Sequence, residues 1–177
     1  LRHILRRQGN VEVRLGEAAS NGPAARAVAL ADGGTLRFDY LLLASGATHA
    51  YFGNDQWAAH APGLKSLDDA LDLRRRLLLA FERAEACDDP AERAAWLNFA
   101  IVGGGPTGVE LAGTLAEIAR HTLRDEFRHI DPASARVRLV EAGPRVLASF
   151  PEALSEKARR QLERLGVEVS TLSLMHI

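Results

Sequence analysis

The stretch that decides the fold of this chain reads Phe99-Ala-Ile-Val-Gly-Gly-Gly-Pro-Thr-Gly-Val-Glu-Leu-Ala-Gly113. An apolar run typical of a strand leads straight into Gly103-x-Gly105-x-x-Gly108, and residues with helical spacing follow. Gly103 permits a tight turn from strand to helix, Gly105 lets the backbone approach a pyrophosphate, and Gly108 lets helix and strand pack closely. The helix N-terminus offers unpaired N–H groups and a partial positive charge to phosphates. The stretch therefore predicts a dinucleotide-binding site.

The sequence around this turn predicts a parallel α/β unit. We expect strands over residues 98–102, 136–141 and 167–169, with a long helix over 107–129 and another over about 152–165. Ser149-Phe-Pro-Glu152 has the form of a capping box, and Gly166 suits a helix end. Residues 64–86 and 90–95 also have helical spacing. The second half of the chain thus reads as the βαβαβ unit of a Rossmann-like fold.

The first half has the pattern of strands and tight turns. Residues 11–15 alternate apolar and polar, and residues 26–31 and 35–38 flank the turn Asp32-Gly33-Gly34, which predicts a hairpin within a β-meander. The apolar run at 40–44 predicts a strand buried on both faces. Ser45, Gly46 and Ala47 follow it. Small residues there either let a cofactor lie against the backbone or form a plain turn.

Composition excludes several classes of function. The 177 residues are 47% hydrophobic and 25% charged, as in a globular protein, and the net charge of −1 leaves no footprint for nucleic acid or an anionic membrane. A single cysteine, Cys87, cannot form an internal disulfide and suits a reducing cytosol. The histidines lack metal-ligand spacing, so we expect no metal site. No apolar run has the length of a transmembrane helix.

Two acids are candidates for recognising the nucleotide. Glu141 ends the second strand of the unit, where a carboxylate accepts hydrogen bonds from ribose hydroxyls and repels a 2′-phosphate, which favours NADH over NADPH. The alternatives are a solvated strand-end acid, or accommodation of a phosphate by Arg145. Glu110 is expected in the first turn of the glycine-turn helix, where it either compensates the helix dipole or faces the reacting end of the nucleotide.

These motifs together resemble the type II NADH dehydrogenases, the non-proton-pumping NADH:quinone oxidoreductases within the two-dinucleotide flavoprotein reductases. The resemblance covers roughly residues 10 to 169 and is more specific than any single motif. It rests on the segments Phe38–Thr48, Tyr51-Phe-Gly53, Ala61–Lys65, Arg74–Arg76, Ala80–Ala84, Val102–Gly113 and Val140–Leu147. The ending Ser170–Ile177 does not resemble the family.

The resemblance implies two domains and a role for each candidate residue. Residues 1–62 would be part of an FAD-binding domain, with Ser45, Gly46 and Ala47 near FAD, and residues 63–177 an NADH-binding domain. Glu141 would bind the ribose of NADH, and Glu110 would lie near the contact between nicotinamide and flavin as the catalytic residue. The turn residues that would hold the NADH pyrophosphate are Gly103, Gly105, Pro106, Thr107 and Gly108.

The function implied is transfer of a hydride from NADH to FAD, then of two electrons to a quinone. The family further implies a cytoplasmic enzyme peripheral to the inner membrane, a homodimer in the full-length protein, and an FAD phosphate loop and membrane-attaching segments outside this sequence. We therefore expect this chain alone to bind FAD poorly and to have little activity. The alternatives are another flavoprotein reductase, with a disulfide, ferredoxin or rubredoxin as acceptor, and a non-catalytic NADH-binding module.

Overall fold

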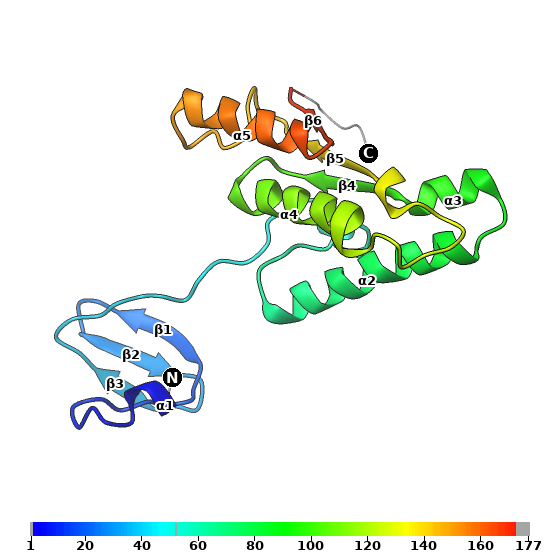
Figure 1. Cartoon of the computed structure of the whole chain (residues 1–177). Helices are drawn as coiled ribbons and strands as arrows, with labels where there is room; N and C mark the ends of the chain where they lie inside the picture. The colour runs from blue at the N-terminus through cyan, green and yellow to red at the C-terminus, as the bar shows by residue number, and fades with distance from the viewer. Residues whose placement is uncertain (1, 52, 173–177) are drawn as a thin grey trace. The chain divides into compact units, whose positions relative to one another are not determined.

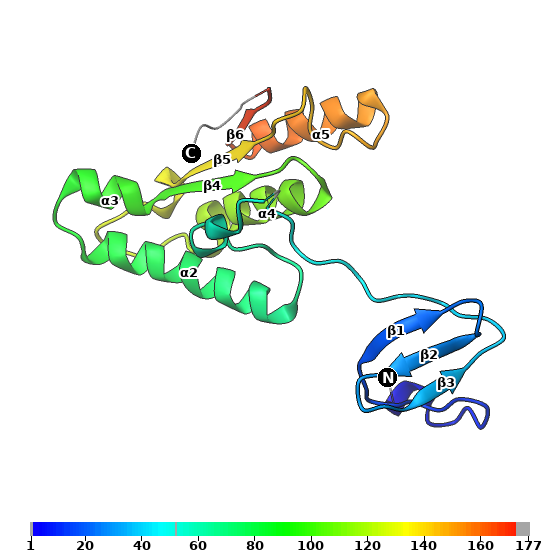
Figure 2. The same ribbon diagram turned by 180° about the vertical axis from the view of Figure 1, so that it is seen from behind.

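The computed structural model describes residues 2–51 and 53–172, and the chain divides into two compact units, Leu1–Ala47 and Thr48–Ile177 (Figures 1 and 2). Each unit has its own sheet: the sheet of the first unit is antiparallel and that of the second is parallel. The assignment of residues 1–62 to FAD and 63–177 to NADH stays a prediction.

The first unit is a small β-meander. The turn before its last strand is formed as the sequence predicts, because Gly33 has a φ of +88° and the Asp32 carboxylate accepts the N–H of Gly34 at 2.9 Å. The predicted hairpin and meander are therefore confirmed. The elements of this unit are α1 (Arg2–Leu5) and the strands β1 (Ala18–Gly22), β2 (Ala27–Leu30) and β3 (Thr35–Arg37), which pair in the order β1-β2-β3.

Two strand predictions in the first unit are wrong. Residues 11–15 and 40–44 are irregular, and the side chains of the second run are exposed, Tyr40 by 97% and Leu42 by 89%. A strand buried on both faces needs neighbours for its N–H and C=O groups. Among the described residues this unit's sheet consists of β1, β2 and β3, so the apolar run has no neighbouring strand.

The second unit begins with η1 (Asp55–Ala59), a 3₁₀ helix, and the long helix α2 (Leu67–Ala86). α2 opens on a capping box: the Ser66 hydroxyl accepts the N–H of Asp69 at 3.1 Å, and the Asp69 carboxylate accepts the N–H of Ser66 at 2.8 Å. α3 (Pro90–Trp96) follows, with the Asp89 carboxylate accepting the N–H of Ala91 at 3.0 Å. Both helices were expected from the sequence.

A parallel three-stranded sheet organises the rest of the unit. The strands pair in the order β4-β5-β6, and α4 and α5 pack on the same face of the sheet (Figure 1). Their shared core includes Ile101, Leu139, Leu115 and Leu162. The predicted βαβαβ unit is therefore confirmed. Its elements are β4 (Asn98–Val102), α4 (Pro106–Glu117), β5 (Arg136–Val140), α5 (Glu152–Arg164) and β6 (Val167–Ser170).

The helix after the glycine turn is shorter than predicted. α4 ends at Glu117, and one π-helical segment, η2 (Ile118–Thr122), continues it before the chain turns away. The chain between η2 and η3 (Pro132–Ser134), a 3₁₀ helix, is irregular. Hydrophobic spacing through residue 129 reflects packing of this irregular segment on the core, since Leu123 and Phe127 contact the cluster around Phe81.

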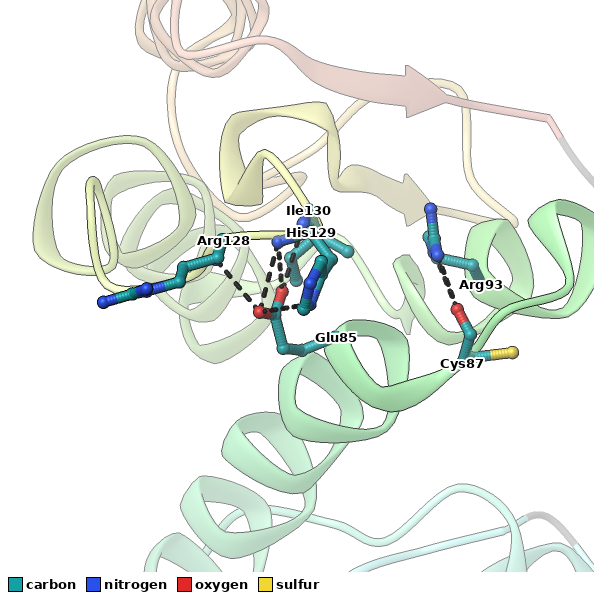
Figure 3. A network of polar contacts seen from close by, with 6 residues as sticks. All are labelled: Glu85, Cys87, Arg93, Arg128, His129 and Ile130. Carbon is teal, nitrogen blue, oxygen red and sulfur yellow. Dashed lines mark hydrogen bonds and ion pairs between the residues drawn. The ribbon is translucent and has the colours of Figure 1, made fainter.

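Glu85 on α2 fixes this irregular segment (Figure 3). Its carboxylate accepts the backbone N–H groups of Arg128, His129 and Ile130 at distances of 2.9 to 3.1 Å, and it lies 3.0 Å from Nδ1 of His129. Burial alone would raise the pKa of Glu85, but the N–H groups of Arg128 and His129 outweigh it and lower that pKa below the ordinary 4.5. Glu85 thus replaces the helical hydrogen bonds that this segment lacks.

The ends of α5 differ in how well the sequence predicts them. The expected capping box is wrong: the N-cap of α5 is Pro151, and no side chain of the described residues caps it. The expected C-terminal stop is confirmed, because Gly166 has a φ of +76° and donates its N–H to the Glu163 carbonyl at 2.9 Å. Residues 173–177 of the ending that does not resemble the family lie outside the described residues. Within the described residues, none of the helices combines the length and hydrophobicity needed to span a membrane.

Candidate nucleotide-binding site

The glycine turn joins the carboxyl end of β4 to α4, as the sequence predicts. Gly103 has a φ of +105°, a conformation that side chains strongly disfavour, and its N–H bonds to the Val140 carbonyl of β5 at 2.8 Å. A methyl group built on Gly108 would overlap the carbonyl oxygen of Gly103 and lie 3.5 Å from Leu139 Cδ1. Both glycines are therefore required by the turn itself.

The backbone of the turn does not require glycine at Gly105. It is the N-cap of α4 with a φ of −73°, which any residue adopts, and a methyl group built on it would meet no described atom within 4 Å. Pro106 occupies the first helical position and lacks an N–H. The first helical bond runs from Val109 N–H to the Gly105 carbonyl at 3.0 Å, so the N–H groups of Thr107 and Gly108 precede it. These N–H groups can donate hydrogen bonds to an anion, and the open space beside Gly105 leaves room for it.

The Glu141 carboxylate lies directly against this turn. Its Oε2 accepts the N–H of Gly104 at 2.5 Å and its Oε1 accepts the N–H of Gly143 at 2.6 Å. Methyl groups built on Gly104 and Gly143 would each approach Glu141 side-chain atoms to 3.0 Å, so both glycines make room for the acid. A carboxylate has about four acceptor positions, so two remain for hydroxyl groups of a ligand.

The Arg145 guanidinium is already bound within its own loop. It donates to the carbonyls of Phe150 and Ala148 at 2.7 and 2.8 Å and to the hydroxyl of Ser155 at 2.8 Å. That hydroxyl donates to the Leu147 carbonyl at 3.1 Å. Three of the five N–H donors of Arg145 are therefore occupied within the protein, which the sequence does not reveal.

Glu110 lies in the second turn of α4, not in the first as expected, because the first turn contains no acidic residue. The helix dipole falls off beyond the first turn, so it no longer explains this acid. Glu110 is exposed, and within the described residues its side chain makes no hydrogen bond or ion pair. Its carboxylate is therefore free to face a ligand.

The three residues expected near FAD lie in the first unit. Ser45, Gly46 and Ala47 are exposed in irregular chain, and Gly46 has a φ of +77°. A methyl group built on Gly46 would meet no described atom within 4 Å. The small side chains and open surroundings are compatible with a flat ring system lying on the backbone.

Sequence reasoning missed three residues of the candidate nucleotide site. Gly104 contacts Glu141 through its N–H, and the third glycine in the run Gly103-Gly-Gly105 is a signal that could have indicated it. Leu147, with a φ of +50°, donates its N–H to the Gly104 carbonyl at 2.7 Å. Ser155 is only 3% exposed and bonds to Leu147. Nothing in the sequence marks the last two.

Comparison with known proteins identifies relatives of this chain. Two curated relatives from Mycobacterium tuberculosis, the type II NADH:quinone oxidoreductases Ndh and NdhA, are 48% and 50% identical over 171 residues. Both alignments cover 95% of this chain but only 37% and 36% of the relatives. The chain thus spans just over a third of their length. The external alternative NADH-ubiquinone oxidoreductase of Yarrowia lipolytica is 35% identical over 138 residues, covering 78% of this chain and 24% of the relative.

Solved structures share the fold. The structure of NDH2 from Plasmodium falciparum in complex with NADH matches with a TM-score of 0.73 at 24% identity, covering 88% of this chain and 32% of that one. A ferredoxin reductase from Rhodopseudomonas palustris matches with a TM-score of 0.62 at 21% identity, covering 96% of this chain and 35% of that one. The predicted Rossmann-like fold class and the resemblance to type II enzymes are confirmed. Because residues 2–176 match the family described as pyridine nucleotide-disulphide oxidoreductase, this chain belongs to that family.

Proposed function

We propose that the glycine turn of this chain binds NADH, and that the whole protein is an FAD-dependent NADH:quinone oxidoreductase. The observation that carries the proposal is the Glu141 carboxylate held on the N–H of Gly104, at the end of β5 and beside an open helix N-terminus. A pyrophosphate fits the N–H groups of Thr107 and Gly108, and the adenosine ribose fits the free acceptor positions of Glu141.

The charges around Glu141 favour NADH over NADPH. The carboxylate would lie beside a 2′-phosphate and repel it. The two arginines nearest to Glu141 along the chain are both engaged elsewhere: Arg138 pairs with Glu168 at 2.9 Å, and Arg145 makes three hydrogen bonds to its own loop and α5. A 2′-phosphate would therefore meet the acid without a free arginine to compensate it.

The remaining candidate residues would have two roles: three would contact the flavin, and one would orient the nicotinamide. FAD, when bound, accepts a hydride from NADH and passes two electrons to the acceptor. Ser45, Gly46 and Ala47 would hold it through their backbone, since their side chains leave the surface open. Glu110 is exposed and unpaired among the described residues, two positions beyond Gly108, and would orient the nicotinamide end of NADH.

We propose a quinone as acceptor because the relatives with 48% and 50% identity are type II NADH:quinone oxidoreductases. The ferredoxin reductase resembles the chain in fold alone. We further propose that the whole protein is a cytoplasmic homodimer that contacts the inner membrane peripherally. Another flavoprotein reductase and a non-catalytic NADH-binding module remain the competing functions.

Steady-state assays of the whole protein that contains this chain test the proposal. NADH oxidation would be measured with a quinone, a disulfide and a ferredoxin as acceptors, and we expect turnover with the quinone. Glu110→Gln should lower kcat with little change in KM for NADH, whereas Glu117→Gln, an exposed acid at the end of the same helix, should change neither. Faster turnover with a disulfide or ferredoxin would refute the quinone reductase, and NADH binding without any turnover would identify a binding module.

A further inference from the structure

A continuous series of hydrogen bonds joins Arg145 to the ribose acid. Arg145 donates to the Ser155 hydroxyl at 2.8 Å, and that hydroxyl donates to the Leu147 carbonyl at 3.1 Å. The Leu147 N–H donates to the Gly104 carbonyl at 2.7 Å, and the Gly104 N–H donates to Glu141 at 2.5 Å. The chain from residue 141 to 155 therefore holds the glycine turn through both polar atoms of Gly104.

Leu147 is the strained member of this series. Its φ of +50° lies in the left-handed region, which residues other than glycine rarely adopt. Such a residue persists when its surroundings fix it, and strain of this kind clusters at functional sites. Here its N–H and its carbonyl are both bonded, and Arg145 binds the carbonyls of Ala148 and Phe150 on the following residues.

We propose that Arg145 is a positioning residue for NADH: it fixes Leu147, and through Leu147 it sets the place of the glycine turn and of Glu141 before the nucleotide binds. This inference rests on the proposed NADH site. Among the described residues, no hydrogen bond or ion pair joins Arg145 to the turn or to Glu141. Three N–H groups of Arg145 donate to carbonyls and a hydroxyl of its own loop and α5, so we expect its effect to be on nucleotide affinity and not on the choice between NADH and NADPH.

Titration of the 177-residue chain with NADH and with NADPH tests the proposal. Arg145→Ala should weaken NADH about tenfold, the equivalent of one charge-assisted hydrogen bond, and should weaken NADPH by the same factor. Ser155→Ala removes the middle of the series without changing charge and should weaken both nucleotides about threefold to tenfold. Arg145→Lys should recover part of the affinity, because lysine reaches a carbonyl but lacks the planar fork.

Two control variants separate positioning from charge and from stability. Arg160→Ala removes the same charge from α5, where Arg160 pairs with Glu156 on the surface, and should leave both affinities unchanged. Glu85→Gln weakens the attachment of the Arg128–Ile130 segment and should lower thermal stability while leaving NADH affinity unchanged. Hydrogen exchange at the Leu147 and Gly104 amides should accelerate in Arg145→Ala and not in Arg160→Ala.

Each other outcome overturns the proposal in a distinct way. Arg145→Ala that binds NADH within twofold of the unsubstituted chain would show that the turn does not depend on the arginine. Selective loss of NADPH would make Arg145 a phosphate ligand instead. If Arg145→Ala does not fold, Ser155→Ala decides between these results. Failure of the unsubstituted chain to bind NADH would refute the proposed nucleotide site, while amide exchange at Leu147 and Gly104 would still test the coupling to Arg145.

Discussion

Alanine at two glycines of the same turn should affect different properties: stability at Gly108 and NADH binding at Gly105. Gly108→Ala places a methyl group over the Gly103 carbonyl oxygen and 3.1 Å from the Gly103 carbonyl carbon, so the start of α4 must shift. Overpacking of this kind costs about 1–3 kcal/mol, and the better helix propensity of alanine returns up to about 1 kcal/mol. Because the overlap is with backbone atoms, the cost lies in the upper part of that range, about 2–3 kcal/mol, and after the return from helix propensity the free energy of unfolding should fall by about 1–2 kcal/mol.

Gly105→Ala should change stability little but should reduce NADH binding strongly. The methyl group meets no described atom within 4 Å and φ is −73°. The loss of glycine at an N-cap and the lower entropy of the unfolded chain oppose each other, which leaves the free energy of unfolding within about 0.5 kcal/mol of its original value. The same methyl group occupies the space where a pyrophosphate approaches, so NADH should bind at least about tenfold more weakly.

Urea unfolding and NADH titration of the 177-residue chain measure both quantities. Trp57 and Trp96 both belong to the Thr48–Ile177 unit, so their fluorescence reports on the unit that contains the turn. Equal destabilisation by the two substitutions would contradict the steric assignment of Gly108. Unchanged NADH affinity in Gly105→Ala would refute the pyrophosphate site.

Three further predictions concern the acids and the flavin. Glu141→Gln places an amide NH₂ where the carboxylate accepts the N–H of Gly104 or Gly143, so NADH should bind about 10- to 100-fold more weakly and NADPH should lose less affinity. Equal losses of affinity in parallel titrations would show that Glu141 does not distinguish NADH from NADPH. Because the pKa of Glu85 is lowered below 4.5 in the folded chain, the stabilising effect of Glu85 is present above that pH and is lost as the pH falls through the folded pKa. The difference in Tm between the unsubstituted chain and Glu85→Gln should therefore shrink at acidic pH, and a difference that grows on acidification would contradict this prediction. The chain alone should purify without stoichiometric flavin absorbance, because Ser45 and Gly46 lie in exposed irregular chain; stoichiometric FAD together with quinone turnover would refute this.

The features that the sequence predicts best are those that local sterics determine. The turn at Gly103, the close packing at Gly108 and the turn at Gly33 depend on a few neighbouring residues, and all three form as expected. Hydrophobic periodicity likewise locates α2 and β5 to within a few residues.

Features that depend on distant partners escape sequence reasoning. The apolar run at Tyr40 predicts a buried strand, but a strand forms only where another strand supplies hydrogen bonds. Arg145 looks available to a phosphate until Ser155 and the loop carbonyls are placed around it. The irregular segment at Arg128–Ile130 is held by Glu85, which lies over forty residues along the chain from the N–H groups that it accepts.

The most direct test of the central claim is to follow the backbone amide resonances of the 177-residue chain during NADH titration. Binding at the glycine turn should shift the resonances of Gly103, Gly104, Thr107, Gly108 and Gly143 with one saturating constant. AMP should shift the Gly143 and Gly104 resonances most, because it carries the ribose that Glu141 is proposed to bind. Saturating shifts elsewhere in the chain, with these amides unchanged, would contradict the account.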